Sequence, residues 1–443
     1  MTSRTVAALT TTLALCGALR FGIAVHHMPH GARGDYAATL PGAYVKAINP
    51  VLWDSPDLQN SYVYHRDLYV YGPAQYLLLY PTAFLDSYAQ IANVLGYVYG
   101  VLLAVTIAVL ARVIVDRRVW YLAALGGVAG IVLLFPPTYQ AYIQREFEVV
   151  ALLCLVLATY LLIARREGWA GTLLGFITWF KLWPVAFAAY FLAKRQYRAV
   201  AAFVAASCLT LGLGQLVFGL DRFMVLSPSA ASSVYGSRFI LASLVPPLES
   251  ATFAAQAGGP PSPHGQGFCG TWYPSEQTAV GVRWAICRLA YSNRWLPAPE
   301  VFYAMTIVLA LAALCAFIRI QRKDGLTESE HRWSTIWEMS LVTMGAALML
   351  SAHYYYFVFL ILPLTAMAYH LARGGQMIKL AALGGAYCLL SVFLIPLSLG
   401  SSLLGIDLWR FYVEHAVYLY GEIILVTLVL WEYTAIGLRE SPQ

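Results

Sequence analysis

The sequence predicts an all-α polytopic membrane protein, and three observations lead to this fold class. Hydrophobic residues make up 60% of the 443-residue chain, charged residues only 11%, and the mean hydropathy is +0.65. Apolar runs of the length that crosses a bilayer recur along the chain. The cations behind the net charge of +6 fall largely between these runs. That placement is a topology signal, so it gives no reason to expect a nucleic-acid partner.

We expect about 12 membrane passes within a single domain that covers residues 1–443. The first run carries one arginine and lacks a small-residue cleavage site, which favours a retained span over a signal peptide. The predicted spans cover residues 5–25, 89–112, 118–136, 147–164, a pair of half-helices within 169–193, 197–219, 301–320, 335–352, 354–372, 379–399 and 414–437.

The basic residues then gather on one side of the predicted membrane. They are Arg4, Arg112, Arg117, Arg118, Arg165, Arg166, Lys194, Arg195, Arg198, Arg319, Arg322, Lys323, Arg332, Arg373, Lys379 and Arg439. By the positive-inside rule this side is cytoplasmic, and both termini lie there. The half-helix pair is essential to this result, because a single span would put the clusters at 165–166 and 194–198 on opposite sides.

Lys181 is the reason for dividing the run 169–193. As one span, it would hold this cation near the bilayer centre, at a cost of roughly 2.5 to 3.5 kcal/mol. The apolar stretches on either side are about 12 residues each, too short to cross singly. A break before Pro184 would place Lys181 at an apex between two half-helices. A cation there suggests an anionic ligand, and a lysine paired with a nearby carboxylate for packing is the alternative.

Two segments are too long to be simple connectors, residues 26–88 and 220–300, and both fall on the extracytoplasmic side. The first is rich in tyrosine, which suits interfacial helices. The second contains a Pro/Gly-rich stretch at 258–267 and an amphipathic helix expected over 275–291. Cys269 and Cys287 share this loop, and a disulfide between them is left open.

Polar residues mark the outer membrane boundary, and we look for chemistry there. The set is Asp35, Arg145, Glu146, Glu148, Lys181, Arg238, Arg283 and His353. Several have a plainer explanation: Asp35 as an exposed loop residue, 144–148 as an ion-pair cluster at a helix N-terminus, and His353 as a structural histidine in an aromatic belt. The histidines at 26, 27 and 30 lack metal-site spacing, and no nucleotide-binding motif is present.

Several segments together resemble the bacterial polyprenyl-phosphate-mannose-dependent alpha-1,2-mannosyltransferase group of the GT-C superfamily. They are the acidic Asp35 after the first span, Tyr71-Gly-Pro-Ala-Gln-Tyr-Leu-Leu-Leu-Tyr-Pro81, Gln144-Arg-Glu-Phe-Glu148, residues 170–184 around Lys181, Tyr273-Pro-Ser-Glu-Gln-Thr-Ala-Val-Gly-Val-Arg283 and His353-Tyr-Tyr-Tyr356. The resemblance covers most of the chain, although each motif is short and degenerate.

The resemblance implies a GT-C fold and an inverting glycosyltransferase without cofactor or metal. It would move a sugar, mannose in that group, from a polyprenyl-phosphate donor to a lipid-anchored glycan or glycolipid on the outer face. Asp35 is then the expected base, with Lys181 and Arg283 as ligands of the donor phosphate. Six further residues are expected to bind substrate: Arg145, Glu146, Glu148, Gln277, His353 and Tyr354.

The sequence departs from the group's pattern at two places. The usual Gly-Gln-x-Asn reads Gln144-Arg-Glu-Phe-Glu148, and the usual Asn-Gln-Ser reads Ser275-Glu-Gln-Thr278. Both changes add carboxylates, which leaves the sugar and the acceptor open. A transporter or flippase of a lipid-linked or anionic solute is the alternative function, since transporters also use broken helices. The absence of an internal repeat counts against it. A non-catalytic assembly subunit is the third possibility.

Overall fold

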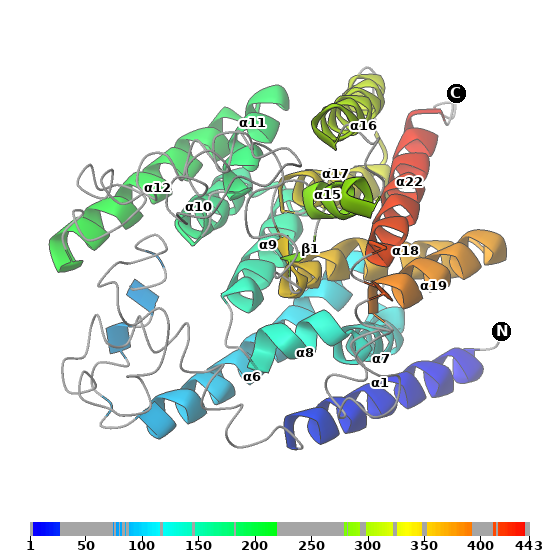
Figure 1. Ribbon diagram of the computed structural model, residues 1–443, viewed down its shortest axis with the longest axis horizontal. Helices are drawn as coiled ribbons and strands as arrows, with labels where there is room; N and C mark the ends of the chain where they lie inside the picture. The colour runs from blue at the N-terminus through cyan, green and yellow to red at the C-terminus, as the bar shows by residue number, and fades with distance from the viewer. Residues whose placement is uncertain are drawn as a thin grey trace.

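A computed structural model describes residues 3–26, 74, 77–78, 80–81, 85, 88–115, 118–143, 147–180, 183–218, 279–280, 282–292, 298–321, 326–347, 352–391, 411–412 and 415–438. These residues form a bundle of helices, confirming the predominantly helical fold class (Figure 1). The start of α1 (Ser3–His26) and the end of α22 (Val417–Leu438) lie on the same side of Figure 1.

Among the described residues, the elements that follow α1 include α6 (Tyr88–Ile114), α7 (Arg118–Leu134) and α8 (Pro136–Ile143). Gly130 of α7 lets α1 approach closely, because a Cβ added there would lie 2.8 Å from the Cβ of Leu13. α7 and α8 are bent by 69° at Phe135. Proline favours the first position of a helix and cannot continue the preceding one, so Pro136 explains both the end of α7 and the start of α8. The sequence analysis did not anticipate α8.

The predicted break within 169–193 is confirmed. The chain forms α9 (Glu148–Ile163), α10 (Glu167–Ile177), the 3₁₀ turn η4 (Trp183–Val185), α11 (Ala186–Ala193) and α12 (Tyr197–Phe218). Beyond the end of α10, the backbone hydrogen bonds change from the α-helical to the 3₁₀ pattern. The Phe180 amide donates to the Ile177 carbonyl, three residues earlier, at 3.0 Å. Pro184 lies inside η4, where the ring leaves no amide to continue a helix.

α10 and α12 pack in parallel with a constant register. A Cβ added at Gly171 would lie 2.1 Å from the Ala199 carbonyl oxygen, and one at Gly175 would lie 2.3 Å from that of Phe203. The Ser207 hydroxyl donates to the Gly175 carbonyl at 3.0 Å. Both helices therefore run the same way, so α11 must return between them. The two ends of the half-helix pair lie at one end of the bundle, as the hairpin interpretation requires.

The second half contains α15 (Val282–Ser292), α16 (Ala298–Gln321), α17 (Glu328–Ala347), α18 (Ile361–Arg373), α19 (Met377–Ser391) and α22. Between them lie the short strands β1 (Ala279–Val280) and β2 (Ala352–His353) and the 3₁₀ segment η7 (Tyr354–Leu360). The predicted helix over 275–291 is wrong at its start, because residues 279–280 are extended and pair with β2. The predicted span at 335–352 is likewise corrected at its end, since α17 ends at Ala347 and residues 352–353 form β2. The predicted span at 354–372 agrees with the candidate span Tyr356–Arg373, although its first part is the 3₁₀ segment η7 and α18 begins only at Ile361.

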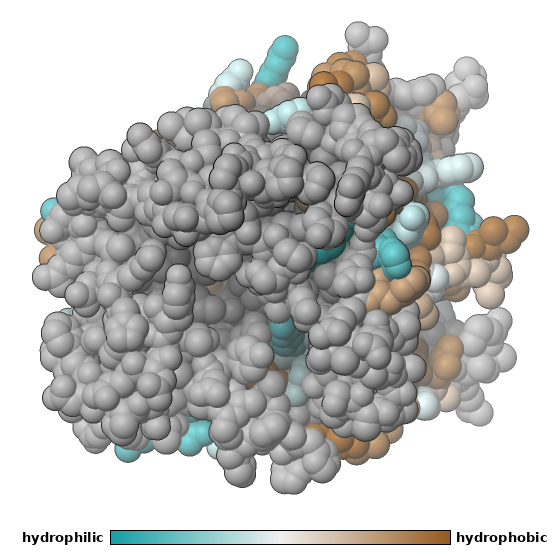
Figure 2. All heavy atoms as spheres, in the orientation of Figure 1, coloured by the Kyte–Doolittle hydropathy of each residue, from teal (hydrophilic) through white to brown (hydrophobic). Residues whose placement is uncertain are grey.

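The outer surface of the bundle suits lipid. Leu216 of α12 is 83% exposed and Leu15 of α1 is 66% exposed, and hydrophobic residues are visible at the right-hand and lower edges of Figure 2. Among the described residues, four segments are long and apolar enough to cross a membrane, and the bent α7/α8 pair would be a fifth. They are Asn93–Ile114, Tyr197–Val217, Tyr356–Arg373 and Val417–Ile436. The chain is a membrane protein by these features, and the total of about 12 passes stays a prediction.

Candidate functional site

Aromatic contacts bring three segments together around the break in the hairpin. Phe180 at the end of α10 packs on Phe147, with ring centroids 5.6 Å apart. Trp183 of η4 packs on Phe359 of η7 at 4.8 Å. The start of α9, the break and η7 therefore meet at one place, although they are far apart in sequence. Lys181, the predicted phosphate ligand, lies outside the described residues between Phe180 and Trp183.

Glu148 is the predicted site residue that the structure describes most fully in this region. It is the first residue of α9 and only 3% exposed. A carboxylate in the first turn is stabilised by the helix dipole, which offsets part of the cost of its burial. Phe147, at the N-cap, makes no side-chain capping bond. Arg145 and Glu146 lie outside the described residues, as do Asp35 and Gln277.

The β1–β2 ladder joins two more predicted site segments. Ala279 is paired with His353, and Val280 with Ala352, in an antiparallel register. Arg283 lies in the first turn of α15, shortly after β1, so it follows the strand that pairs with the segment containing His353. Tyr354, the next predicted site residue, is 2% exposed, and its hydroxyl donates to the Leu390 carbonyl at 2.9 Å.

α15 is fixed to α22 by a buried arginine. Arg288 is 3% exposed, and its Nη1 donates to the Tyr418 hydroxyl at 2.8 Å. Cys287 beside it is disulfide-bonded. Its candidate partner, Cys269, lies outside the described residues. One turn along α22 from Tyr418, the carboxyl group of Glu422 is buried, with its Oε1 unbonded among the described residues.

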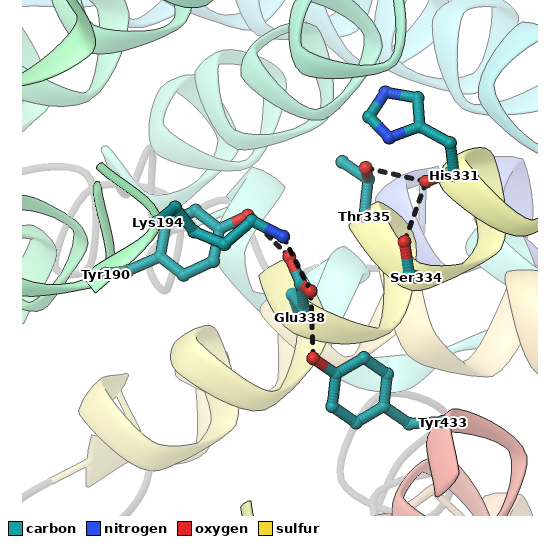
Figure 3. Close-up of polar contacts among 7 residues, drawn as sticks. All are labelled: Tyr190, Lys194, His331, Ser334, Thr335, Glu338 and Tyr433. Carbon is teal, nitrogen blue, oxygen red and sulfur yellow. Dashed lines mark hydrogen bonds and ion pairs between the residues drawn. The ribbon is translucent and has the colours of Figure 1, made fainter. Parts of the chain in front are cut away.

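A second polar cluster surrounds Glu338 of α17 (Figure 3). Its Oε1 accepts hydrogen bonds from Lys194 Nζ at 3.0 Å and from the Tyr433 hydroxyl at 2.8 Å. Its Oε2 accepts one from the Tyr190 hydroxyl at 2.8 Å. The cluster joins the ends of α11 and α22 to α17. Tyr433 lies 15 residues beyond Tyr418, or about 22 Å along α22, so this cluster is well removed from the Arg288 contact.

Glu432, next to Tyr433, forms a matching contact with α18 and α19. Its Oε2 lies 3.0 Å from His370 Nε2 and its Oε1 lies 2.6 Å from Lys379 Nζ. His370 in turn packs edge-on against Trp333 at 4.6 Å. Acidic residues within predicted apolar spans were the available sequence signal for Glu338, Glu422 and Glu432, since such residues usually have a partner or a function.

His331 lies on α17 two turns before Glu338. Burial and the charge of Arg165 lower the pKa of His331. α17 also packs against α9, the helix that the turn containing Arg165 follows. No group of three His, Cys, Asp or Glu side chains that could hold a metal ion occurs within the part of the chain that the structure describes.

A comparison with known families links part of the chain to a glycosyltransferase family. The sequence model of glycosyltransferase family 87, a family of GT-C-type membrane glycosyltransferases, matches residues 69–255. The matched stretch includes Glu148 and the whole hairpin, and it ends before Arg283. No curated protein and no solved structure matches the chain. The family match supports glycosyltransferase activity, and such an enzyme uses a sugar donor and an acceptor.

Proposed function

We propose that this chain is an inverting glycosyltransferase that takes a sugar, mannose, from a polyprenyl-phosphate donor. The acceptor is a lipid-anchored glycan or glycolipid on the extracytoplasmic face. The observation that carries the proposal is the meeting of α9, the hairpin break and η7 through the Phe147–Phe180 and Trp183–Phe359 contacts. Two of these three segments fall within the stretch matched by glycosyltransferase family 87.

Cations beside the break suit a lipid-linked phosphate. In the sequence Lys181 lies between Phe180 and Trp183, and both of these aromatic side chains are held by ring contacts. Arg283 follows β1, whose pairing with β2 ties it to the segment before η7. A phosphate held by Lys and Arg leaves readily, because the cations stabilise the charge that develops on it. Six further residues are proposed to bind the sugar and the acceptor: Arg145, Glu146, Glu148, Gln277, His353 and Tyr354.

The proposed reaction is a single displacement. Asp35 accepts the proton of the acceptor hydroxyl as that oxygen forms its bond to the anomeric carbon. The bond from the anomeric carbon to the phosphate oxygen breaks at the same time, and its electron pair leaves with the phosphate. The configuration at the anomeric carbon is therefore inverted. One carboxylate is sufficient, because the leaving phosphate needs no proton.

The test is transfer by the purified chain in proteoliposomes, with a polyprenyl-phosphate donor whose mannose is radiolabelled and a short mannoside acceptor. A glycosyltransferase yields labelled acceptor with a new glycosidic bond of inverted configuration. A transporter or flippase would move intact donor between leaflets and leave the acceptor unlabelled. An assembly subunit would do neither, and either result would overturn the proposal.

A further inference from the structure

A pocket lies at the foot of the hairpin, at the opposite end of α10 from the break and its aromatic contacts. It has a volume of about 430 Å³ and is lined by Arg165, Arg166, Glu167, Gly168, Trp169 and Arg198. The first five residues form the turn into α10, and Arg198 is in the first turn of α12. The volume falls within the ~300–1,000 Å³ of typical small-molecule sites.

The charge in this pocket is unbalanced. Three guanidinium groups face one carboxylate, that of Glu167, which leaves a net charge of +2 from +3 and −1. The ion pairs between described residues involve Lys194, His370 and Lys379, so they do not neutralise the three arginines. A multivalent anion is the ligand that this arrangement fits.

Helix geometry adds to the positive potential. Arg166 is the N-cap of α10, which begins without a side-chain capping bond, and Arg198 is the second residue of α12. Cations at helix N-termini oppose the helix dipole, so neither position is explained by helix stability. Arg165 has φ 57, a left-handed conformation that glycine usually occupies at a helix end. An anion in this pocket would be attracted by the N-termini of both helices and by all three guanidinium groups.

The position of the pocket at the start of a candidate span points to a lipid. Trp169 and Tyr197 are each 66% exposed, and exposed aromatic residues of this kind favour the membrane–water interface. α12 enters a candidate span directly afterwards, at Tyr197–Val217. Three arginines at head-group level next to an exposed indole form a surface for a charged head group and the start of its acyl chains.

We propose that this pocket binds the phosphate of an anionic membrane lipid in the leaflet on the side of the arginine clusters. The bound head group bridges the α9–α10 turn and the start of α12. It thereby stabilises the foot of the hairpin, and the break at 178–185 lies at the other end of the same hairpin. Phosphate recognition by arginine is the shared chemistry, and a free phosphate ion is the competing source. The proposal does not depend on the enzyme activity proposed above.

The experiment compares lipids retained by the purified full chain in native mass spectrometry, with phosphatidylglycerol and phosphatidylcholine as probes. The double variant Arg166→Gln/Arg198→Gln keeps Arg165, Lys194 and Arg195, so most of the topology signal survives. Each lost cation near an anionic lipid weakens binding about fivefold, or roughly 25-fold together. We expect this loss for phosphatidylglycerol and a much smaller change for phosphatidylcholine.

Two controls keep the result interpretable. The variant Arg112→Gln/Arg332→Gln removes the same charge from arginines that bond backbone carbonyls outside the pocket, and it should bind phosphatidylglycerol like the wild type. Glu167→Gln raises the pocket charge to +3 and should bind more tightly, which a misfolded protein cannot do. A second measurement compares the thermal unfolding of the protein with inorganic phosphate and with phosphatidylglycerol at the same concentration. We expect inorganic phosphate to give no stabilisation.

Equal lipid retention by the pocket and control double variants would overturn the proposal and leave the arginines as topology signals only. Stabilisation by inorganic phosphate that matches the effect of phosphatidylglycerol would overturn the lipid as the ligand. Neither outcome bears on sugar transfer, which is measured separately.

Discussion

Glu338 shows how this protein stabilises a carboxylate that lies within its helix bundle. The side chain is 3% exposed and accepts three hydrogen bonds, from Tyr190, Lys194 and Tyr433. A buried carboxylate is costly without such partners, and removal of one member of a buried pair exposes the full cost. Glu338 thus holds α11 and α22 against α17, and this structural role explains its burial without a role in catalysis.

Glu338→Gln is therefore expected to destabilise the protein by about 3 kcal/mol, because Lys194 loses its counterion. The measurement is thermal unfolding in detergent. Tyr433→Phe is the matched control and should cost only about 1 kcal/mol, since it removes one hydrogen bond and leaves the ion pair intact. Equal effects of the two changes would mean that the ion pair contributes little.

Two arginines on α15 have different expected roles: Arg283 is a proposed ligand of the donor phosphate, and Arg288 makes a structural contact. Arg288 is buried against Tyr418, whereas Arg283 lies five residues earlier, in the first turn of the same helix. Arg288→Met should lower the unfolding temperature because the buried hydrogen bond between Arg288 and the Tyr418 hydroxyl is lost. Arg283→Ala, like Lys181→Ala, should weaken donor binding about tenfold or more with little effect on stability, since each removes a charge-assisted contact. Donor binding that is unchanged in folded Arg283→Ala and Lys181→Ala would reassign both cations to structural ion pairs.

At the scale of elements, the contact between α10 and α12 depends on two glycines. The carbonyl oxygens of Ala199 and Phe203 occupy the space where Cβ atoms at Gly171 and Gly175 would lie. The spacing Gly171-x-x-x-Gly175 is a known signature of close helix packing in membranes, and it was visible in the sequence without being used.

Gly175→Ala should destabilise the protein by about 1 to 3 kcal/mol, because the two helices must move apart. The measurement is again thermal unfolding. Gly212→Ala is the control, since a Cβ at Gly212 meets nothing within 4 Å, and it should be neutral or stabilising. Similar destabilisation by both would contradict the close contact.

The sequence supported some of these elements better than others. The break in the hairpin was predictable because Lys181 is costly inside a single span and Pro184 cannot continue a helix. The β1–β2 ladder was not, because two residues per strand give no periodicity and the partners are more than 70 residues apart. The same holds for η7, whose aromatic run also fits a helix or an interfacial belt. The partners of Glu338 and Arg288 depend on tertiary contacts that a single sequence does not reveal.

At the scale of the whole molecule, the hairpin determines the topology. Because α10 and α12 run in parallel, the arginine clusters at 165–166 and 194–198 lie at one end of the bundle. By the positive-inside rule we expect this end to be cytoplasmic, and we expect Asp35 and Trp272 on the other side of the membrane.

Accessibility of single cysteines to an impermeant maleimide tests this arrangement, in a background without the native free cysteines. In intact cells, a cysteine at position 272 should react, and cysteines at 117, 165, 195 and 322 should react only after permeabilisation. Labelling of position 272 from the cytoplasmic side alone would overturn the topology and the location proposed for the site.

The most direct test of the central claim is sugar transfer by Asp35→Asn alongside donor binding by the same protein. The amide keeps the shape and hydrogen bonding of the side chain but accepts no proton at neutral pH. Transfer should fall on the order of 100-fold to 10,000-fold, while donor binding and expression stay near those of the wild type. Near-normal transfer by Asp35→Asn would contradict the account, since another carboxylate such as Glu146 or Glu148 would have to be the base.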